Sequence, residues 1–306
     1  MNEPLHGILP PVTTPFSQHG EILYQALEAN LKRYLQKPVS GFLLLGSNGE
    51  SAHLSRHEKL EIVRLACRTV PTDRQLIVGV SFASLRDSAS FAQELSGLPI
   101  DALLAATPSY FKNRMTDQAL ARYFSDLADR SPFPLLLYNV PQYSGIALSS
   151  SLIAELARHP NISGMKDSSG NLSYLQSILA VAGNQDFQVV LGSAQIFGPS
   201  LTLGIRAAIL AVACALPELP ARLMEAYQQG EGIAELQAEL YEIAVALTTR
   251  YGVAGLKKAM DLAGFEGGSC RLPLLPLADE EAREIETILR SARLAEKLLV
   301  TAPERA

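Results

Sequence analysis

A tyrosine and a lysine stand near the ends of two consecutive apolar runs, where their chemistry could be combined. Tyr138 lies near the end of residues 134–139, and Lys166 near the end of residues 162–167. Removal from water favours the neutral form of an amine, which is the form that attacks a carbonyl carbon. A phenol beside such an amine could move the protons needed to form a carbinolamine and to cleave a C–C bond. The pair therefore indicates Schiff-base chemistry on a carbonyl substrate.

Each of these two residues also has a simpler interpretation. Lys166 could end a sheet with its ammonium in water, and Tyr138 could be a packing residue with a hydrogen-bonded hydroxyl. Side chains alternate along a strand, so Lys166 shares a face with Ile162 and Gly164. If that face points inward, the amine lies among apolar side chains, above a glycine that leaves room for a substrate.

Other polar residues follow neighbouring apolar runs. Ser47 and Asn48 stand in a glycine-flanked turn whose hydroxyl, amide and backbone N–H groups suit a carboxylate, although such a turn can equally be a plain loop. Ser168 begins a Ser-Ser-Gly segment that could bind an anion or simply cap a helix. His53 and His57 are four residues apart, but Ser55 and Glu58 explain that segment as a helix start, so we expect no metal site.

For these residues to form one site, the fold must bring the ends of several strands together. The chain alternates short apolar runs with amphipathic helical segments. Buried parallel strands have this near-continuous apolar pattern. The runs cover residues 7–12, 41–46, 76–80, 102–107, 134–139, 162–167, 187–192 and 207–212. Eight such repeats predict an α/β fold, a (β/α)₈ TIM barrel, with an open doubly wound sheet as the alternative. In a barrel, functional groups gather at the carboxyl ends of the strands.

The segment after the eighth run predicts a C-terminal extension of three helices. They cover residues 234–250, 254–263 and 280–299 and are separated by glycine- and proline-rich stretches. We therefore expect a catalytic barrel over residues 1–230 and a helical extension over residues 231–306 that packs on it.

Composition excludes several classes of protein. The net charge of −5 and the absence of long Lys/Arg runs give no indication of a nucleic-acid or membrane partner. Cys67, Cys214 and Cys270 are far apart, and we expect the first two to be small core residues of a protein in a reducing compartment. With no export or organelle signal at the N-terminus, we expect a cytoplasmic location.

Three motifs together resemble one known family. They are G-S-N-G-E at residues 46–50, Y-N-V-P at residues 138–141 and G-M-K-D-S-S-G-N at residues 164–171. In this order they resemble the dihydrodipicolinate synthase/N-acetylneuraminate lyase superfamily, over nearly the whole chain. The resemblance implies a homotetramer, a dimer of dimers, that acts on a 2-oxo acid without cofactor or metal.

The same resemblance implies roles for individual residues. Lys166 would form the imine with the 2-oxo acid, Tyr138 would relay protons, and Ser47 and Asn48 would hold the substrate carboxylate and support the tyrosine. Tyr110 would be donated across a subunit contact. We expect the substrate pocket to be completed by a further set of residues, namely Ser168, Gly192, Ile209 and Tyr143.

Differences between this sequence and particular members of the family indicate which reaction to expect. Synthases of this family carry an arginine five residues after the proton-relaying tyrosine, for the carboxylate of aspartate semialdehyde, and here that position holds Tyr143. Segments 159–170, 185–194, 250–261 and 267–274 resemble 4-hydroxy-2-oxoglutarate aldolase, which forms pyruvate and glyoxylate. We therefore expect a class I aldolase, a lyase, of this type. The alternatives are a dihydrodipicolinate synthase, another pyruvate-dependent aldolase, and a non-catalytic 2-oxo-acid sensor.

Overall fold

Eight parallel strands form a barrel in this computed structural model, which describes residues 4–182 and 186–292. The strand order is β1-β8-β7-β6-β5-β4-β3-β2. The two ends of the sheet meet where Pro11 bridges Leu43 in parallel and the N–H of Val12 donates to the Leu43 carbonyl at 2.9 Å. The strands are β1 (Gly7–Ile8), β2 (Gly41–Leu44), β3 (Gln75–Gly79), β4 (Ala102–Ala106), β5 (Leu135–Asn139), β6 (Ile162–Asp167), β7 (Gln188–Leu191) and β8 (Ala207–Ala208). This confirms the (β/α)₈ barrel and excludes the open sheet.

Both faces of the strands are buried, which is why the strands read as continuous apolar runs. Side chains of one face fill the barrel interior, among them Leu43, Leu104 and Leu136. Side chains of the other face, such as Leu135 and Leu137, pack against the surrounding helices. The alternation therefore decides which residue at a strand end can face the interior.

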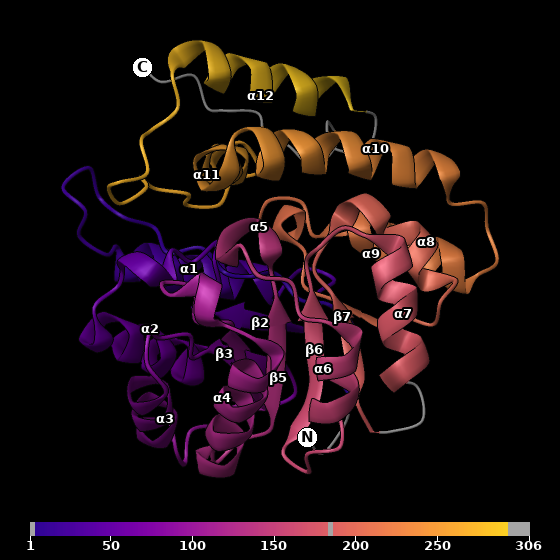
Figure 1. The fold of residues 1–306 in the computed structure, drawn as a ribbon. Coiled ribbons are helices and arrows are strands. Elements are labelled where there is room, and N and C mark those ends of the chain that lie inside the picture. Colours follow the sequence, from indigo (N-terminus) through magenta and orange to yellow (C-terminus); the bar gives the residue numbers. More distant parts are fainter. Residues whose placement is uncertain (1–3, 183–185, 293–306) are drawn as a thin grey trace.

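Helices alternate with the strands and surround them (Figure 1). The predicted capping box at the start of α2 is present, because the Ser55 hydroxyl accepts from the Glu58 N–H at 3.2 Å and the Glu58 carboxylate accepts from the Ser55 N–H at 2.7 Å. The helices are α1 (Tyr24–Tyr34), α2 (Arg56–Thr69), α3 (Leu85–Glu94), α4 (Asp117–Arg130), α5 (Pro141–Ser144), α6 (Ser150–Leu156), α7 (Leu172–Ala182), α8 (Phe197–Leu201) and α9 (Glu218–Gln228).

The first and last strands are shorter than the sequence predicts. After Ile8 the chain reaches Pro10 and Pro11, which have no N–H to donate to a ladder. After Ala208 the apolar run leaves the sheet and forms the 3₁₀-helix η4 (Ala211–Cys214) beneath the C-terminal helices. An apolar run of this length does not by itself distinguish a buried strand from a buried helical turn.

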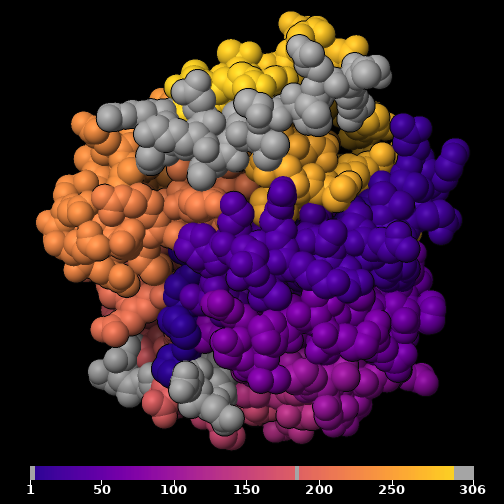
Figure 2. All heavy atoms as spheres, turned by 180° about the vertical axis from the view of Figure 1, so that it is seen from behind, coloured from indigo at the N-terminus to yellow at the C-terminus, as the bar shows by residue number. Residues whose placement is uncertain are grey.

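Three C-terminal helices form a layer across one end of the barrel (Figure 1), and the N-terminal segment lies at the other end. α10 (Ala234–Ala244) continues as the π-helical turn η5 (Val245–Arg250) and is followed by α11 (Gly252–Leu262) and α12 (Asp279–Ser291). The part of the third predicted helix after residue 292 lies outside the described residues. Seen from behind, the N-terminal part of the chain, indigo to purple, adjoins these orange and yellow helices (Figure 2). No helix in the described part of the chain is long and apolar enough to cross a membrane.

Candidate active site

A cavity of about 400 Å³ lies between the carboxyl ends of the strands and the C-terminal layer. This is the end of a barrel at which active sites are built. Its walls come from strand ends, from the loops that follow them and from the end of α10. The lining residues are Pro11, Ser47, Asn48, Tyr138, Gln142, Tyr143, Lys166, Ser168, Ser169, Gly170, Gly192, Ser193, Ala194, Gln195, Ile209, Ala211, Val212, Ala244, Thr248 and Thr249. Of the candidate site residues, all but Tyr110 are therefore brought together in one cavity.

Tyr138 and Lys166 lie side by side at the base of this cavity. They are direct partners in the parallel register of β5 and β6, and the Lys166 Nζ lies 4.5 Å from the centre of the Tyr138 ring. Both side chains are buried, with 6% of Tyr138 and 4% of Lys166 exposed. The position of the amine over the ring face is a cation–π arrangement. The interpretation of Lys166 as a lysine with its ammonium in water is therefore wrong.

The Tyr138 hydroxyl is surrounded by groups that favour its ionised form. Burial raises the pKa of Tyr138, but the nearby Lys166 charge and hydrogen bonds from Ser47, Ser168 and Lys166 outweigh burial, so the net pKa lies below its usual value of 10. The Ser47 Oγ lies 3.4 Å from the phenol oxygen. A phenol with a lowered pKa releases its proton more readily than a free tyrosine, which suits it to proton transfer beside an amine.

Gly192, the residue that directly follows β7, provides room for the Lys166 side chain. A Cβ on Gly192 would lie 1.9 Å from the Ser168 Oγ and 2.9 Å from the Lys166 Cε. The glycine expected to provide this room, Gly164, does not line the cavity. A Cβ there would meet the Gln188 carbonyl oxygen at 2.2 Å, so Gly164 is explained by close approach of β7's backbone.

The turn that carries Ser47 and Asn48 leaves β2 with an unusual backbone. Leu45 and Glu50 are the two non-glycine residues with positive φ in the described part of the chain, at 54° and 53°. Such angles are uncommon outside glycine and persist where surrounding contacts hold them. Gly49 fits between them because a Cβ there would lie 2.9 Å from the Val12 carbonyl oxygen. The turn projects Ser47 toward the Tyr138 hydroxyl.

A buried polar pair, which sequence reasoning missed, connects the ends of β5 and β6. Asn139 is the register partner of Asp167 and donates from Nδ2 to its Oδ1 at 2.7 Å. Ser169 donates to the same carboxylate from its N–H and its hydroxyl. Burial raises the pKa of Asp167, although these hydrogen bonds oppose the effect. The pair holds the loops after both strands, and hence the neighbouring Tyr138 and Lys166.

The C-terminal layer forms part of the wall, and sequence reasoning missed this contribution. Thr248 and Thr249 lie in the π-helical turn η5, and the Gln195 amide donates to the Thr249 hydroxyl at 3.1 Å. π-helical turns occur frequently at functional sites. The only signal in the sequence is a Thr-Thr pair that interrupts an apolar helical stretch. Gln142, just after β5, was likewise missed.

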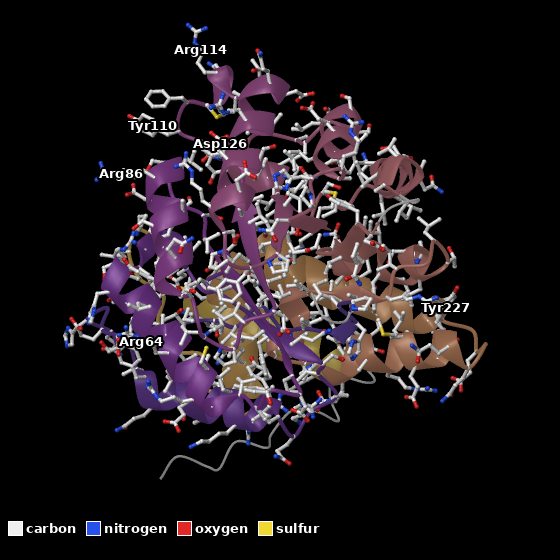
Figure 3. The ribbon with its side chains drawn as sticks, turned by 90° about the horizontal axis from the view of Figure 1, so that it is seen from below. Arg64, Arg86, Tyr110, Arg114, Asp126 and Tyr227 are labelled. Carbon is white, nitrogen blue, oxygen red and sulfur yellow. The ribbon has the colours of Figure 1, made fainter. Side chains whose placement is uncertain are left out.

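Tyr110 is the one candidate that does not reach the cavity of its own chain. It is 86% exposed and contacts Phe111 edge to face, with ring centres 4.9 Å apart. Figure 3 shows it projecting outward beside Arg114. Tyr110 lines a second cavity of about 540 Å³, next to the first, which shares Ser47, Tyr138 and Tyr143 with it.

The three cysteines and His57 line neither of these cavities, whereas His53 lines the second one. Cys214 is buried as predicted, and its thiol donates to the Pro11 carbonyl at 3.1 Å, whereas Cys67 and Cys270 are half-buried. His53 Nδ1 lies 3.2 Å from a Glu50 carboxylate oxygen.

The chain is similar to a known family over most of its length. The model of the Dihydrodipicolinate synthetase family matches residues 4–292. A 4-hydroxy-tetrahydrodipicolinate synthase of Methanosphaerula palustris is 33% identical over 287 residues, which are 92% of this chain and 98% of that protein.

Solved structures give the same result for the fold. A prophage protein of the dihydrodipicolinic acid synthase family from E. coli K12, determined with pyruvate, has a TM-score of 0.88 at 27% identity and covers 94% of this chain and 99% of its own. A 2-keto-3-deoxygluconate aldolase variant from Sulfolobus solfataricus has a TM-score of 0.85 at 24% identity, with 95% and 99% covered, which is a likeness of fold.

Proposed function

Since this chain belongs to the dihydrodipicolinate synthetase family, we propose that it cleaves 4-hydroxy-2-oxoglutarate to pyruvate and glyoxylate. Its family makes it a pyruvate-dependent class I aldolase. The observation that carries the proposed chemistry is the buried contact between Lys166 and Tyr138. The choice of substrate is supported by Tyr143 and by the sequence segments that resemble 4-hydroxy-2-oxoglutarate aldolase.

The first step of the proposed mechanism forms the imine. The neutral amine of Lys166 attacks the C2 carbonyl carbon, and Tyr138 carries protons so that the carbinolamine loses water and becomes an iminium. Ser47 hydrogen-bonds to the phenol and orients it.

The second step breaks the C3–C4 bond. A base removes the proton of the C4 hydroxyl, with Tyr138 or the substrate's own carboxylate as candidates, and the bonding electrons pass to the iminium to give an enamine. Glyoxylate leaves, the enamine is protonated at C3, and water releases pyruvate from Lys166.

Substrate binding is assigned to the neutral polar groups of the cavity. We propose that Ser47, Asn48 and the N–H groups of their turn hold the C1 carboxylate, which provides orientation more than chemistry. The glyoxylate half would lie toward the residues at the ends of β6, β7 and β8 and after β5, which are Ser168, Gly192, Ile209 and Tyr143.

The second candidate function is condensation of pyruvate with aspartate semialdehyde, which the name of the Methanosphaerula relative favours. Of the described residues that line the cavity, Lys166 is the only lysine or arginine. Lys112 and Arg114, in the loop after β4, could supply a charge, but they do not line it and Lys112 lies beside Gly145. A phenol at position 143 in place of a guanidinium loses a charge-assisted hydrogen bond, worth roughly 1.5–3 kcal/mol or about 10- to 150-fold in binding.

Coupled assays with each substrate separate the two reactions and also a non-catalytic sensor. We expect kcat/KM for 4-hydroxy-2-oxoglutarate cleavage to exceed that for semialdehyde condensation by at least about tenfold. Tyr143→Arg should narrow this gap, whereas Tyr227→Arg, a surface control on α9, should not. Efficient condensation by the wild-type enzyme would contradict the choice of substrate, and pyruvate binding without any turnover would favour the sensor.

Assembly and location are proposed from the same family resemblance. We propose a cytoplasmic homotetramer in which Tyr110 of one subunit completes the site of another. The exposure of the adjacent Tyr110 and Phe111 rings supports a protein contact at this place, because large exposed aromatic patches are typical of interfaces.

A further inference from the structure

We infer that the buried ion pair between Glu50 and Lys257 is a positioning device for the turn that carries Ser47 and Asn48. The pair joins the loop after β2 to α11, 207 residues away in the sequence. The inference rests on the proposed function of this turn in holding the substrate carboxylate.

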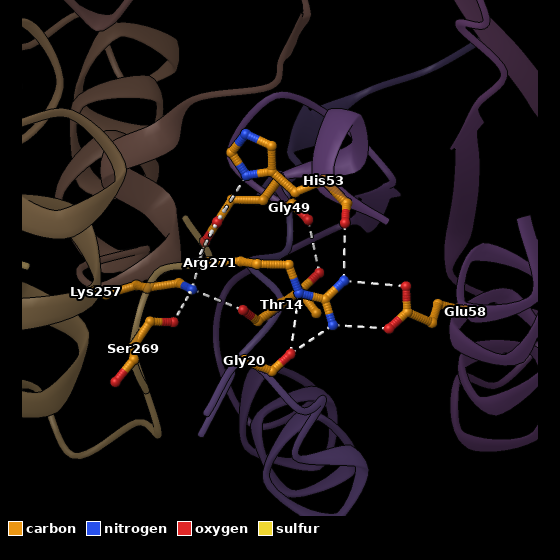
Figure 4. A network of polar contacts seen from close by, with 9 residues as sticks. Thr14, Gly20, Gly49, His53, Glu58, Lys257, Ser269 and Arg271 are labelled. Atoms are coloured by element: carbon orange, nitrogen blue, oxygen red, sulfur yellow. Dashed lines mark hydrogen bonds and ion pairs between the residues drawn. The ribbon is translucent and has the colours of Figure 1, made fainter. Parts of the chain in front are cut away.

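All three hydrogen-bond donors of the Lys257 side chain have acceptors among its neighbours. Its Nζ donates to the Glu50 Oε1 at 2.6 Å, to the Thr14 carbonyl at 2.8 Å and to the Ser269 carbonyl at 2.6 Å (Figure 4). Only 2% of Lys257 is exposed. An ammonium has three N–H donors, and each has an acceptor here. Burial lowers the pKa of Lys257, and the Glu50 carboxylate opposes this effect. With all three donors bonded, Lys257 is explained as a structural group and not as a second nucleophile.

The carboxylate of Glu50 is also held on both oxygens. Its Oε2 accepts from the backbone N–H of Arg271 at 2.9 Å and lies 3.2 Å from His53 Nδ1. Thus α11 and the loop that follows it each donate a hydrogen bond to the Glu50 carboxylate of the β2 loop, one to each oxygen. The side chain of Arg271 extends the network, because it donates to the carbonyls of His53 and Gly20 and to the Glu58 carboxylate.

Glu50 lies where the turn needs support. It is one of the two non-glycine residues with positive φ in the described ranges 4–182 and 186–292, and its N–H donates to the Ser47 carbonyl at 3.0 Å. Thr14 completes the connection, because its hydroxyl donates to the Gly49 carbonyl at 2.7 Å while its own carbonyl accepts from Lys257. The backbone of the turn is thus held at its uncommon conformation from the C-terminal layer.

The energetics of buried ion pairs favour positioning over stabilisation. Two charges removed from water lose hydration that their attraction only partly offsets, so replacing such a pair by apolar groups is often neutral for stability. Removing one partner leaves an unpaired buried charge and is strongly destabilising. We therefore explain the Glu50–Lys257 pair by the backbone conformation that it imposes on the turn carrying Ser47 and Asn48, since such a pair adds little to stability.

Three variants test this inference. Lys257→Met leaves the Glu50 carboxylate unpaired, Glu50→Gln/Lys257→Met removes both charges, and Lys37→Met breaks the 2.7 Å pair with Glu218, neither of whose members lines the cavity. Each is examined by thermal unfolding, by steady-state kinetics and by borohydride trapping of pyruvate over a range of pyruvate concentrations.

We expect the double variant to unfold near the wild-type temperature, yet to need at least about tenfold more pyruvate for half-maximal trapping. At saturating pyruvate it should still carry one adduct per chain on Lys166, and KM should rise by a larger factor than kcat falls. Lys257→Met should show the same weak binding where it folds, and Lys37→Met should bind pyruvate normally.

Two outcomes would overturn the inference. A double variant that binds pyruvate within about threefold of wild type would show that the pair has no part in positioning, and one that fails to fold would show that the fold itself needs the pair. Failure of the proposed Schiff-base chemistry is separate, since the wild-type enzyme would then give no adduct on Lys166. A wrong choice of substrate would leave the wild-type adduct on Lys166 in place and would appear in the coupled assays alone.

Discussion

At the scale of single residues, the site depends on the register between β5 and β6. The sequence could predict Tyr138 and Lys166 as candidates because both stand near the ends of consecutive apolar runs. Side-chain alternation relates residues within one strand, so it does not show that these two residues face each other. The structure pairs them directly, at one level of the barrel. The other residues that line the cavity were harder to predict. Gln195 and Thr249, for example, are far apart in the sequence and are hydrogen-bonded only in the folded chain. Gly164 was wrongly predicted to leave room for a substrate. It is instead required by the close approach of the β7 backbone, which the sequence does not show.

Replacing Tyr138 by phenylalanine tests the proton relay. Tyr138→Phe should lower kcat by about 10²–10⁴-fold, the usual contribution of a positioned acid or base, while pyruvate still binds. Tyr123→Phe is a matched control, because its hydroxyl is also hydrogen-bonded to a serine, Ser88 at 3.2 Å, but away from the cavity. A Tyr138→Phe enzyme within about threefold of wild type would show that another group carries the protons.

Ionisation of Tyr138 gives a second test. Because the Ser47 hydrogen bond is one of the interactions that lower the pKa of Tyr138, Ser47→Ala should raise that pKa and move ionisation to higher pH. The tyrosinate absorbance of each protein, less that of the same protein with Tyr138→Phe, measures the change. An unchanged or lower titration midpoint in Ser47→Ala would contradict the described hydrogen bonding.

Gly192 tests the room for the lysine. In Gly192→Ala the added methyl would meet the Ser168 hydroxyl and the Lys166 Cε, so we expect at least about a hundredfold loss of kcat/KM through displacement of the amine. Gly232→Ala is the control, because a Cβ there has no atom within 4 Å. Equal activity of the two variants would show that the site tolerates the methyl group.

At the scale of elements, local signals predicted more than tertiary ones. The capping box at α2 could be recognised because both of its partners lie within four residues. β1 and β8 were predicted too long, because hydrophobicity alone does not show where an apolar run leaves a sheet. The ion pairs Lys257–Glu50, from α11 to the β2 loop, and Arg271–Glu58, from the loop after α11 to α2, could not be predicted, since their partners are more than 200 residues apart.

The Arg271–Glu58 pair should make stability depend on pH. The hydrogen bond from Arg271 is the largest cause that lowers the pKa of Glu58, from 4.5 to about 2. A carboxyl whose pKa is lowered by folding stabilises the protein above its unfolded pKa, and this stabilisation is lost as the pH falls from about 4.5 toward about 2. Because both side chains are partly exposed, screening reduces the effect to about 1 kcal/mol.

Chemical denaturation at several pH values measures this effect. The free energy of unfolding of Glu58→Gln should lie about 1 kcal/mol below that of wild type at neutral pH, and the two should converge as the pH approaches 2. Glu61→Gln, which removes an exposed pair with Arg64 on the same helix, should lose less than about 0.5 kcal/mol. A difference for Glu58→Gln that is constant with pH would contradict the assigned cause.

At the scale of the whole molecule, the exposed position of Tyr110 predicts that the active site is shared between subunits. In a mixture of Lys166→Ala and Tyr110→Phe chains, a mixed dimer would combine an intact Lys166 from one chain with an intact Tyr110 from the other. Refolding the two variants together should therefore recover activity that neither has alone. No recovery, in mixtures shown by native mass spectrometry to contain both chains, would place Tyr110 outside the partner's site.

The division of the molecule into barrel and extension remains a prediction from the sequence. We expect residues 231–306 to act with the barrel as one catalytic unit, because Thr248, Thr249 and Lys257 all lie in this part of the chain and contact the cavity wall or the β2 loop. The proposed activity of the whole molecule, however, depends on one reaction, imine formation at Lys166.

Trapping that reaction is the most direct measurement. Borohydride added with pyruvate should inactivate the enzyme and add one three-carbon unit per chain, which peptide mass spectrometry should find on Lys166. Lys166→Ala should fold, remain unmodified and be inactive. An adduct on Lys257 or Lys258, or no adduct in an active enzyme, would contradict the assignment of Lys166 as the Schiff-base residue.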